Sequence, residues 1–201
     1  MTLNLSDGVL KRRVFNQGVY NSHSKDFMLG QTAKFINKDM SVIDVGAAVG
    51  MYTTFFAQHA KHVYSFEAVP PVYGQLKLVE EKENNVTAYN LAVGSTCGDV
   101  DFFVDDKRLS NSGFRDLVGG QKITVKSVTL DSLHYEDIGF IKIDVEGNEL
   151  DVLHGAEELI ERCKPTVMCE IYPKFNNGPV ADTFKFFFDR GYYCYYNMKG
   201  S

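Results

Sequence analysis

Residues 41–54 read SVIDVGAAVGMYTT, a β-branched apolar run followed by a glycine-rich turn. The run that begins at Val42 is typical of a parallel strand covered on both faces. Gly46 and Gly50 allow a sharp turn and the close approach of a ligand. The helix expected next would point its N-terminal amides at that ligand. The stretch therefore predicts a strand, turn and helix of an α/β protein, with a binding site at the turn.

A second predicted strand, residues 62–66 (HVYSF), leads into Glu67, about 20 positions beyond Gly46. An acid at this distance binds the ribose diol in Rossmann-type sites. The dinucleotide fingerprint G-x-G-x-x-G is incomplete, because Ala48 and Met51 stand at two of its glycine positions. The spacing disfavours NAD and indicates a ligand without a pyrophosphate, such as S-adenosylmethionine. The alternative is an ordinary strand-to-helix turn with no cofactor.

Length and composition predict one domain with a full core, since the chain has 201 residues, 44% hydrophobic and 23% charged. The formal charge of −5 disfavours nucleic acid as a partner. No apolar run is long enough to span a bilayer, so membrane insertion is not expected. The four cysteines lack C-x-x-C spacing and are expected to be reduced core thiols in a cytoplasmic protein. The chain can also be one domain of a longer protein.

The N-terminal residues 1–24 are polar and are expected to form a solvated arm or a first helical turn, and the domain itself to span 25–201. Tyr20 and His23 lie where a flap over the cofactor could form, although a structural role is the alternative for the histidine. A helix is expected before the first strand, from Lys25 to Ile36. Further elements are a helix from Pro70 with Leu76, Leu78 and Val79 on its buried side, and a third strand over 86–93.

An insertion at about 95–130 interrupts the alternation of strands and helices. Residues 99–104 and 122–128 alternate in hydrophobicity like half-exposed strands, and the polar loop 106–120 joins them. Loops of this length in compact domains are usually functional. We interpret the insertion as a β-hairpin whose loop reaches over the site.

Three acids are expected to converge at the carboxyl edge of the sheet, where open α/β sheets bind ligands. Residues 139–147 (GFIKIDVEG) deliver Asp144 and Glu146, and the strand 166–172 ends near Glu170. A charge near the start of the next helix is the alternative reading of Glu146. Lys142 is a less favoured participant in the chemistry of the site, because strand alternation would point it to the face opposite the immediate neighbours of Asp144.

The remaining helices carry no expected chemistry. Glu149 and Asp151, in the first turn of a helix expected from about Asn148 to before Pro165, suit the helix dipole. A last helix, 180–190, and the tyrosine-rich run after it are expected to form core and an edge strand rather than a glycan platform. The buried aromatics expected on that helix are Phe184, Phe187 and Phe188.

With these motifs in place, the chain resembles the FkbM family of S-adenosylmethionine-dependent methyltransferases over roughly residues 25–196. The resemblance lies in VIDVGAAVGMYT, YSFEAVP, NLAVG, VTLDSL and FIKIDVEGNELDVLHGA, the last being the most specific. It implies a Rossmann-like class I methyltransferase fold, a mostly parallel sheet flanked by helices, with the hairpin inserted before the fourth core strand. It also implies O-methyl transfer to an oxygen of a sugar or a polyketide.

The resemblance further implies which residues contact S-adenosylmethionine. These are Asp44, Gly46, Ala47, Gly50, Tyr52, Thr53, Glu67, Ala68, Ala92 and Asp144. Two features depart from the family pattern. Ala48 stands where many members have Asn, and the chain ends soon after residues 192–196, so the final antiparallel strand of the class is missing or comes from elsewhere.

The catalytic hypothesis follows from what methyl transfer needs. A sugar hydroxyl barely ionises at neutral pH, so a positioned base should help, and we assign that role to Glu146 or Glu170, with Asp144 near the cofactor's amino group or the acceptor. The alternative use of Asp144, Glu146 and Glu170 is to bind a divalent metal such as magnesium that orients two sugar hydroxyls. A non-catalytic domain that keeps the fold and, less favoured, a nicotinamide-dependent dehydrogenase stay open. The expected acceptor, a deoxyhexose or another sugar of a glycan, rests on the family analogy.

Overall fold

The structure is a computed structural model that describes residues 13–16, 30, 32–104, 113, 120–171 and 178–196, with the backbone alone at 13–16, 195 and 196. Within these residues, seven parallel strands form the main sheet, in the order β4-β3-β2-β8-β9-β1-β10. They are β1 (Arg13–Asn16), β2 (Ser41–Val45), β3 (Val63–Phe66), β4 (Val86–Tyr89), β8 (Ile138–Ile143), β9 (Thr166–Cys169) and β10 (Tyr193–Tyr196). The predicted mostly parallel sheet is confirmed.

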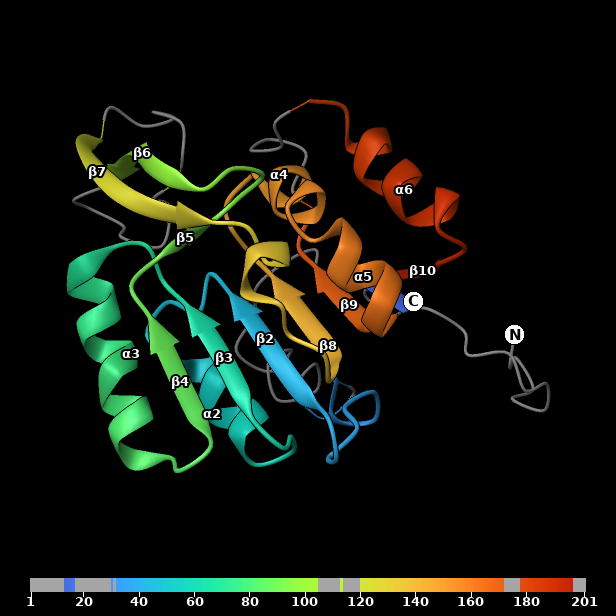
Figure 1. Cartoon of the computed structure of the whole chain (residues 1–201), viewed down its shortest axis with the longest axis horizontal. Coiled ribbons are helices and arrows are strands. Elements are labelled where there is room, and N and C mark those ends of the chain that lie inside the picture. Colours follow the sequence, from blue (N-terminus) through green and yellow to red (C-terminus); the bar gives the residue numbers. More distant parts are fainter. Residues whose placement is uncertain are drawn as a thin grey trace, which may run out of the picture.

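A second, smaller sheet has the order β5-β7-β6 and lies above the carboxyl ends of β3 and β4 in Figure 1. Its strands are β5 (Ala92–Val93), β6 (Gly98–Val104) and β7 (Gln121–Val128). The antiparallel pairing of β6 with β7 confirms the predicted hairpin. Within the loop between them, the described Gly113 bridges back to Phe103 through two backbone hydrogen bonds of 2.7 and 2.9 Å. The predicted third strand over 86–93 is wrong as one element. The chain leaves the main sheet at Asn90, whose side chain donates to the carbonyls of Glu67 and Ala68, and β5 pairs with β7 instead.

Helices cover both faces of the main sheet. One face packs against α2 (Met51–Ala57) through Phe56, and the other packs against the C-terminal helices through Leu153, Leu159 and Phe187. The helices on that second face are α4 (Glu149–His154), α5 (Glu157–Cys163) and α6 (Val180–Asp189), while α3 (Pro70–Lys82) packs beside β4 and a short 3₁₀ turn η2 spans Asp131–Leu133. No helix in the described ranges is long and apolar enough to cross a membrane.

The single helix expected from Asn148 to before Pro165 is in fact two. A Cβ on Gly155 would lie 2.0 Å from the Gly94 carbonyl oxygen, so the backbone of the two segments touches there. Asp131 then accepts hydrogen bonds from the amides of Glu158 and Leu159, at 3.2 and 2.8 Å, which starts a new helix. Contacts with segments distant in sequence therefore override the helical periodicity.

Some side chains lie elsewhere than expected. Leu78 and Phe188 are exposed, and Phe186 takes the buried place predicted for Phe188. Cys97 is also exposed, although all four cysteines are free thiols. Leu78 in α3 and Phe188 in α6 show that helical spacing alone did not identify the buried face.

The N-terminal expectations are tested only in part. Residues 13–16 form β1 between β9 and β10, parallel to both, rather than belonging to a solvated arm or a helical turn. Thr32 and Ala33 are helical, as expected for a helix before β2. Tyr20, His23 and most of the loop 106–120 lie outside the described residues.

Candidate active site

The glycine turn after β2 is set by close backbone packing. Gly46 has φ +73°, and a Cβ there would lie 1.8 Å from the carbonyl oxygen of Asp144, at the end of the neighbouring strand β8. Gly50, the N-cap of α2, has φ +84°, and a Cβ there would lie 2.8 Å from Val79 of α3. Both positions require glycine, because any side chain would collide with the neighbouring element in an unfavourable backbone conformation.

Glu67, directly after β3, is held by two backbone amides. Its Oε2 accepts from the amide of Ala48 at 3.0 Å, and its Oε1 accepts from the amide of Val69 at 2.8 Å. Burial raises the pKa of Glu67 above its usual value, and the two amide donors act in the opposite direction. The glutamate therefore ties the glycine turn to the start of α3, with each oxygen retaining further acceptor capacity.

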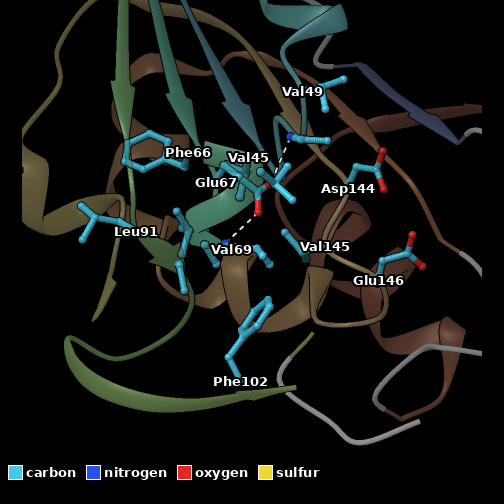
Figure 2. A pocket seen from close by; sticks show the side chains of 16 residues that line it. Val45, Val49, Phe66, Glu67, Val69, Leu91, Phe102, Asp144, Val145 and Glu146 are labelled. Atoms are coloured by element: carbon cyan, nitrogen blue, oxygen red, sulfur yellow. Dashed lines mark hydrogen bonds between the residues drawn. The ribbon is translucent and has the colours of Figure 1, made fainter. Parts of the chain in front are cut away.

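A cavity of about 300 Å³ lies between the glycine turn, β3, β5 and β6. This volume lies at the small end of the range for small-molecule sites. In Figure 2, the amide-bound Glu67 lies near the middle of the view, with Asp144 and Glu146 to its right and Phe102 below it. The remaining walls are apolar, from Val45, Val49, Phe66, Ala68, Val69, Val72, Leu91, Ala92, Val93 and Val145. An apolar cavity with a few convergent carboxyl groups is the usual form of a ligand site.

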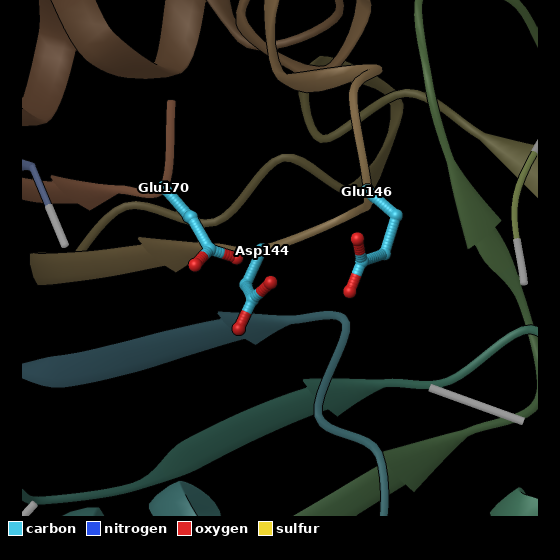
Figure 3. A group of neighbouring side chains, drawn as sticks. All are labelled: Asp144, Glu146 and Glu170. Carbon is cyan, nitrogen blue, oxygen red and sulfur yellow. The ribbon is translucent and has the colours of Figure 1, made fainter. Parts of the chain in front are cut away.

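The three predicted acids meet at one end of this cavity. Asp144 and Glu146 come from the turn after β8, Glu170 follows β9, and one carboxyl oxygen from each lies within 4.8 Å of the other two. Figure 3 shows the three carboxyl groups turned toward one another. Asp144 and Glu146 line the cavity, whereas Glu170 reaches it through Asp144. The predicted convergence is confirmed.

The environment gives these three acids different proton affinities. Burial raises the pKa of Glu170 to about 9, and a hydrogen bond with Asp144 and the charge of Asp144 add to the shift. Burial also raises the pKa of Glu146 to about 7, with the charges of Asp144 and Glu149 contributing. Burial opposes ionisation of Asp144, but the Lys142 ammonium and a hydrogen bond from Glu170 together outweigh it and hold the pKa of Asp144 below its usual value. Near neutral pH, Asp144 is therefore ionised, Glu170 is protonated, and Glu146 is poised between the two states.

Lys142 belongs to this network, contrary to the expectation that set it aside. Its side chain is 3% exposed, and its Nζ lies 3.3 Å from a carboxylate oxygen of Asp44 and 3.3 Å from one of Asp144. Lys142 pairs with Asp44 in register across β8 and β2, and it also donates to the Gly46 carbonyl at 3.2 Å. Burial would lower the pKa of Lys142, but Asp144 and Asp44 together raise it, so the side chain is an ammonium. Lys142 therefore compensates the charge of one buried carboxylate, that of Asp44, and of one partly buried carboxylate, that of Asp144.

The turn that carries Glu146 is stabilised by hydrogen bonds to the Glu149 carboxylate. Glu146 has φ +53°, a left-handed conformation that is unfavourable for a non-glycine residue. Glu149, 2% exposed, accepts from the amides of Val145 and Gly147 through Oε1, at 3.3 and 3.0 Å. Glu149 thus braces the turn, beyond the helix-dipole role that its position in α4 predicted.

The ten predicted cofactor contacts divide into two groups. Those that line the cavity are Gly46, Glu67, Ala68, Ala92 and Asp144. Those that lie outside its lining are Asp44, Ala47, Gly50, Tyr52 and Thr53. The second group supports the first: the Thr53 hydroxyl donates to Asp44 at 2.8 Å, and the Tyr52 ring lies 5.1 Å from the Lys142 ammonium. Their roles toward a ligand stay predictions.

Sequence reasoning missed the wall contributed by the insertion. Phe102 of β6 lines the cavity, as does Val72 in the first turn of α3. The alternation of Val100, Phe102 and Val104 indicated a buried face for β6 but not what that face would meet. Val72 follows Pro70–Pro71, so its place in the first helical turn was readable from the sequence.

Comparison with known proteins places the chain in a family. The sequence profile described as "Methyltransferase FkbM domain" matches residues 44–194. A methyltransferase FkbM from Methylobacillus flagellatus is similar in structure, with a TM-score of 0.56 and 17% identity over 76% of this chain and 37% of that one. The chain thus spans little more than a third of that protein. A protein from Methanobacterium thermoautotrophicum described as precorrin 8W decarboxylase has a TM-score of 0.51 and 15% identity over 88% of this chain and 75% of that one. Comparison with curated sequences finds no match. At these identities, the structural similarities confirm the fold.

Proposed function

Because the chain belongs to the FkbM family of S-adenosylmethionine-dependent methyltransferases, we propose that its cavity binds S-adenosylmethionine and that it methylates a sugar hydroxyl. The observation that carries the proposal is the layout of the cavity, which runs from the amide-bound Glu67 to the acids Asp144 and Glu146. A ribose-binding acid and a proton-accepting acid thus face one ligand space of about 300 Å³.

The cavity suits the parts of the cofactor in order. The ribose hydroxyls would donate to Glu67, whose two oxygens are oriented by the amides of Ala48 and Val69. The adenine would lie among apolar walls such as Ala68 and Ala92, and the methionine part would lie along the turn at Gly46. When bound, S-adenosylmethionine supplies an electrophilic methyl group, so the protein must hold the acceptor oxygen in line and exclude water.

Glu146 is the favoured base for the acceptor hydroxyl. It lines the cavity, and its pKa of about 7 allows it to be ionised and still basic at neutral pH. Glu170 with its pKa of about 9 holds a proton already, so it would hydrogen bond to Asp144 rather than accept a second proton. The carboxyl oxygen of Glu146 would take the hydroxyl proton as the oxygen is methylated.

The acceptor class rests on chemistry and on the family. Asp144 and Glu146 offer several hydrogen-bond acceptors at one end of the cavity, which suits neighbouring hydroxyls of a sugar such as a deoxyhexose in a glycan. A net charge of −5 does not suit nucleic acid. The four free cysteines agree with a reducing compartment, and we place the reaction in the cytoplasm.

A divalent metal at Asp144, Glu146 and Glu170 is the weaker alternative. Carboxylates are suitable magnesium ligands, and these three are close enough together. However, the Lys142 ammonium lies 3.3 Å from Asp144 and would repel a cation bound there. The donor set therefore fits proton transfer better than a resident metal.

Methyl transfer from S-adenosylmethionine labelled in its methyl group tests the proposal. Purified protein is incubated with the labelled donor and a panel of free and nucleotide-linked deoxyhexoses, hexoses and small phenols, with magnesium or with EDTA. The proposal expects label in a sugar, unaffected by EDTA. Label in a phenol alone would reject the sugar assignment, and magnesium-dependent transfer would favour the metal. Donor binding without transfer to any member would favour a non-catalytic domain, while absence of donor binding would reject the cofactor.

A further inference from the structure

The insertion sheet supplies an aromatic wall to the cavity. Phe102 is 7% exposed, lines the cavity, and packs in one cluster with Val69, Val72 and Ala92, which line it too. In Figure 2 its ring points from the β6 ribbon up toward Val69 and Glu67. A flat apolar ring therefore lines the same cavity as the proposed ribose-binding acid and points toward it.

The two neighbouring phenylalanines of β6 have different surroundings. Strand alternation places Phe102 and Val104 on the buried face, both 7% exposed. Phe103, between them, is half-buried, does not line the cavity, and pairs through its backbone with Gly113. Val104 belongs to the same apolar cluster as Phe102 but is absent from the cavity walls. A purely structural role would make Phe102 and Val104 equivalent, whereas the cavity separates them.

This wall suits a planar base as its ligand. Ribose held at Glu67 leaves its base within reach of the apolar walls, of which Val69, Val72 and Ala92 are aliphatic and Phe102 is aromatic. We propose that the Phe102 ring stacks on the adenine of the cofactor, so that the β-hairpin insertion is part of the cofactor site. The inference rests on the proposed function, because it takes the ligand to be an adenosyl compound. Aromatic stacking on a base contributes about 1–3 kcal/mol, which corresponds to roughly fivefold to 150-fold in affinity.

The absence of tryptophan from the chain permits a direct optical test. Phe102→Trp introduces a single tryptophan at the cavity wall, and Phe103→Trp introduces one on the other side of the same strand. S-adenosylhomocysteine is titrated into each variant while tryptophan fluorescence is recorded. Stacking on adenine is expected to quench the fluorescence of Phe102→Trp in a saturable manner and to leave Phe103→Trp unchanged. Equal responses of both variants, or no response of Phe102→Trp when calorimetry detects binding, would overturn the inference.

Affinity separates stacking from core packing. Phe102→Ala is expected to weaken S-adenosylhomocysteine binding by about tenfold or more, and Val104→Ala by less than about threefold, with both variants confirmed as folded by circular dichroism. Phe102→Leu serves if Phe102→Ala does not fold, because it keeps apolar volume without an aromatic ring. Unchanged affinity in the folded Phe102 variant would reject the stacking role. Failure of the wild-type protein to bind S-adenosylhomocysteine would instead reject the proposed function itself.

Discussion

The two ends of the cavity carry the same functional group in opposite arrangements. At one end, both oxygens of Glu67 accept backbone amides, so the carboxylate is fixed in place. At the other end, Glu146 and Glu170 lie near the ionised Asp144, and burial raises their pKa values to about 7 and about 9. Backbone amides at one end orient a carboxylate and favour its charged form, while at the other end burial and the neighbouring charge of Asp144 raise the proton affinity of Glu146 and Glu170. The local partners of each acid, rather than its place at the sheet edge, thus indicate binding or proton transfer.

The largest expected effect comes from removing the Lys142 ammonium, which compensates the carboxylates of Asp44 and Asp144. Lys142→Met should destabilise the protein by about 3–5 kcal/mol, because it leaves the buried carboxylate of Asp44 and the partly buried carboxylate of Asp144 without their cation. Denaturant unfolding measures the loss. Lys61→Met, which removes an exposed ion pair with Asp137, is the control and should cause no measurable change. Equal stability of the Lys142→Met variant and wild type would contradict the assigned network.

The next effect separates the two ends by function. Glu146→Gln should lower the turnover of the identified acceptor by about a hundredfold while leaving the affinity for S-adenosylhomocysteine within about threefold, since the amide cannot accept the hydroxyl proton. Initial rates and calorimetry measure the two quantities. Wild-type turnover in Glu146→Gln with a large loss in Glu170→Gln would move the base assignment to Glu170.

The binding end should respond in the opposite sense. Glu67→Gln should weaken S-adenosylhomocysteine by about tenfold to a hundredfold, because one charge-assisted acceptor for the ribose is lost and one backbone amide faces an amide donor. Glu81→Gln, at the exposed end of α3, is the control. Calorimetric titrations that give the same dissociation constant for Glu67→Gln and wild type would remove Glu67 from the ribose site.

A pH profile sharpens the contrast further. Since Glu146 must lose its proton to act as a base, turnover should rise by about tenfold per pH unit below its pKa of about 7 and level off above it. Values of kcat/KM for the acceptor, which report the pKa of the free enzyme, are measured from about 1.5 pH units below this pKa to about 1.5 pH units above it. A flat profile would show that no group titrating near neutrality is needed in the rate-limiting step.

The last prediction concerns stability and pH. The pKa of Glu170 is raised to about 9 in the folded protein from an ordinary value of 4.5, so the folded state binds the extra proton between these values and its contribution to stability falls as pH rises. Glu170→Gln, which stays neutral, should therefore gain stability relative to wild type at pH values approaching that pKa, and lose the advantage toward pH values near 4.5. Denaturation midpoints measured at both ends of the range test this. A difference that does not depend on pH would argue against a protonated Glu170.

The sequence predicted those parts of the fold and of the candidate site that depend on residues close together along the chain. The turn at Gly46 and Gly50 and the acid Glu67 follow from spacing along one strand–turn–helix unit, and all three lie where they were expected. The place of Lys142 depends on the register between β8 and β2, which puts Lys142 opposite Asp44, about a hundred residues away in sequence. Alternation within a single strand does not give this register. The break at Gly155 likewise depends on contact with Gly94.

The same limit applies to the insertion. Alternation predicted its two strands, but the cavity wall at Phe102 exists only because the hairpin folds back over α3 and β5. Glu149 resembled any acid in a first helical turn until its contacts with the amides of Val145 and Gly147 were known. Patterns within one element were therefore sufficient for the strands and the glycine turn, and pairs between elements required the structure.

Calorimetric titration of the wild-type protein with S-adenosylhomocysteine, with and without magnesium, tests the central claim most directly. The account predicts saturable one-to-one binding with a micromolar dissociation constant that magnesium does not change, because Glu67 and the apolar walls bind the ligand and Lys142 compensates Asp144. Absence of saturable binding by both S-adenosylhomocysteine and S-adenosylmethionine would contradict it.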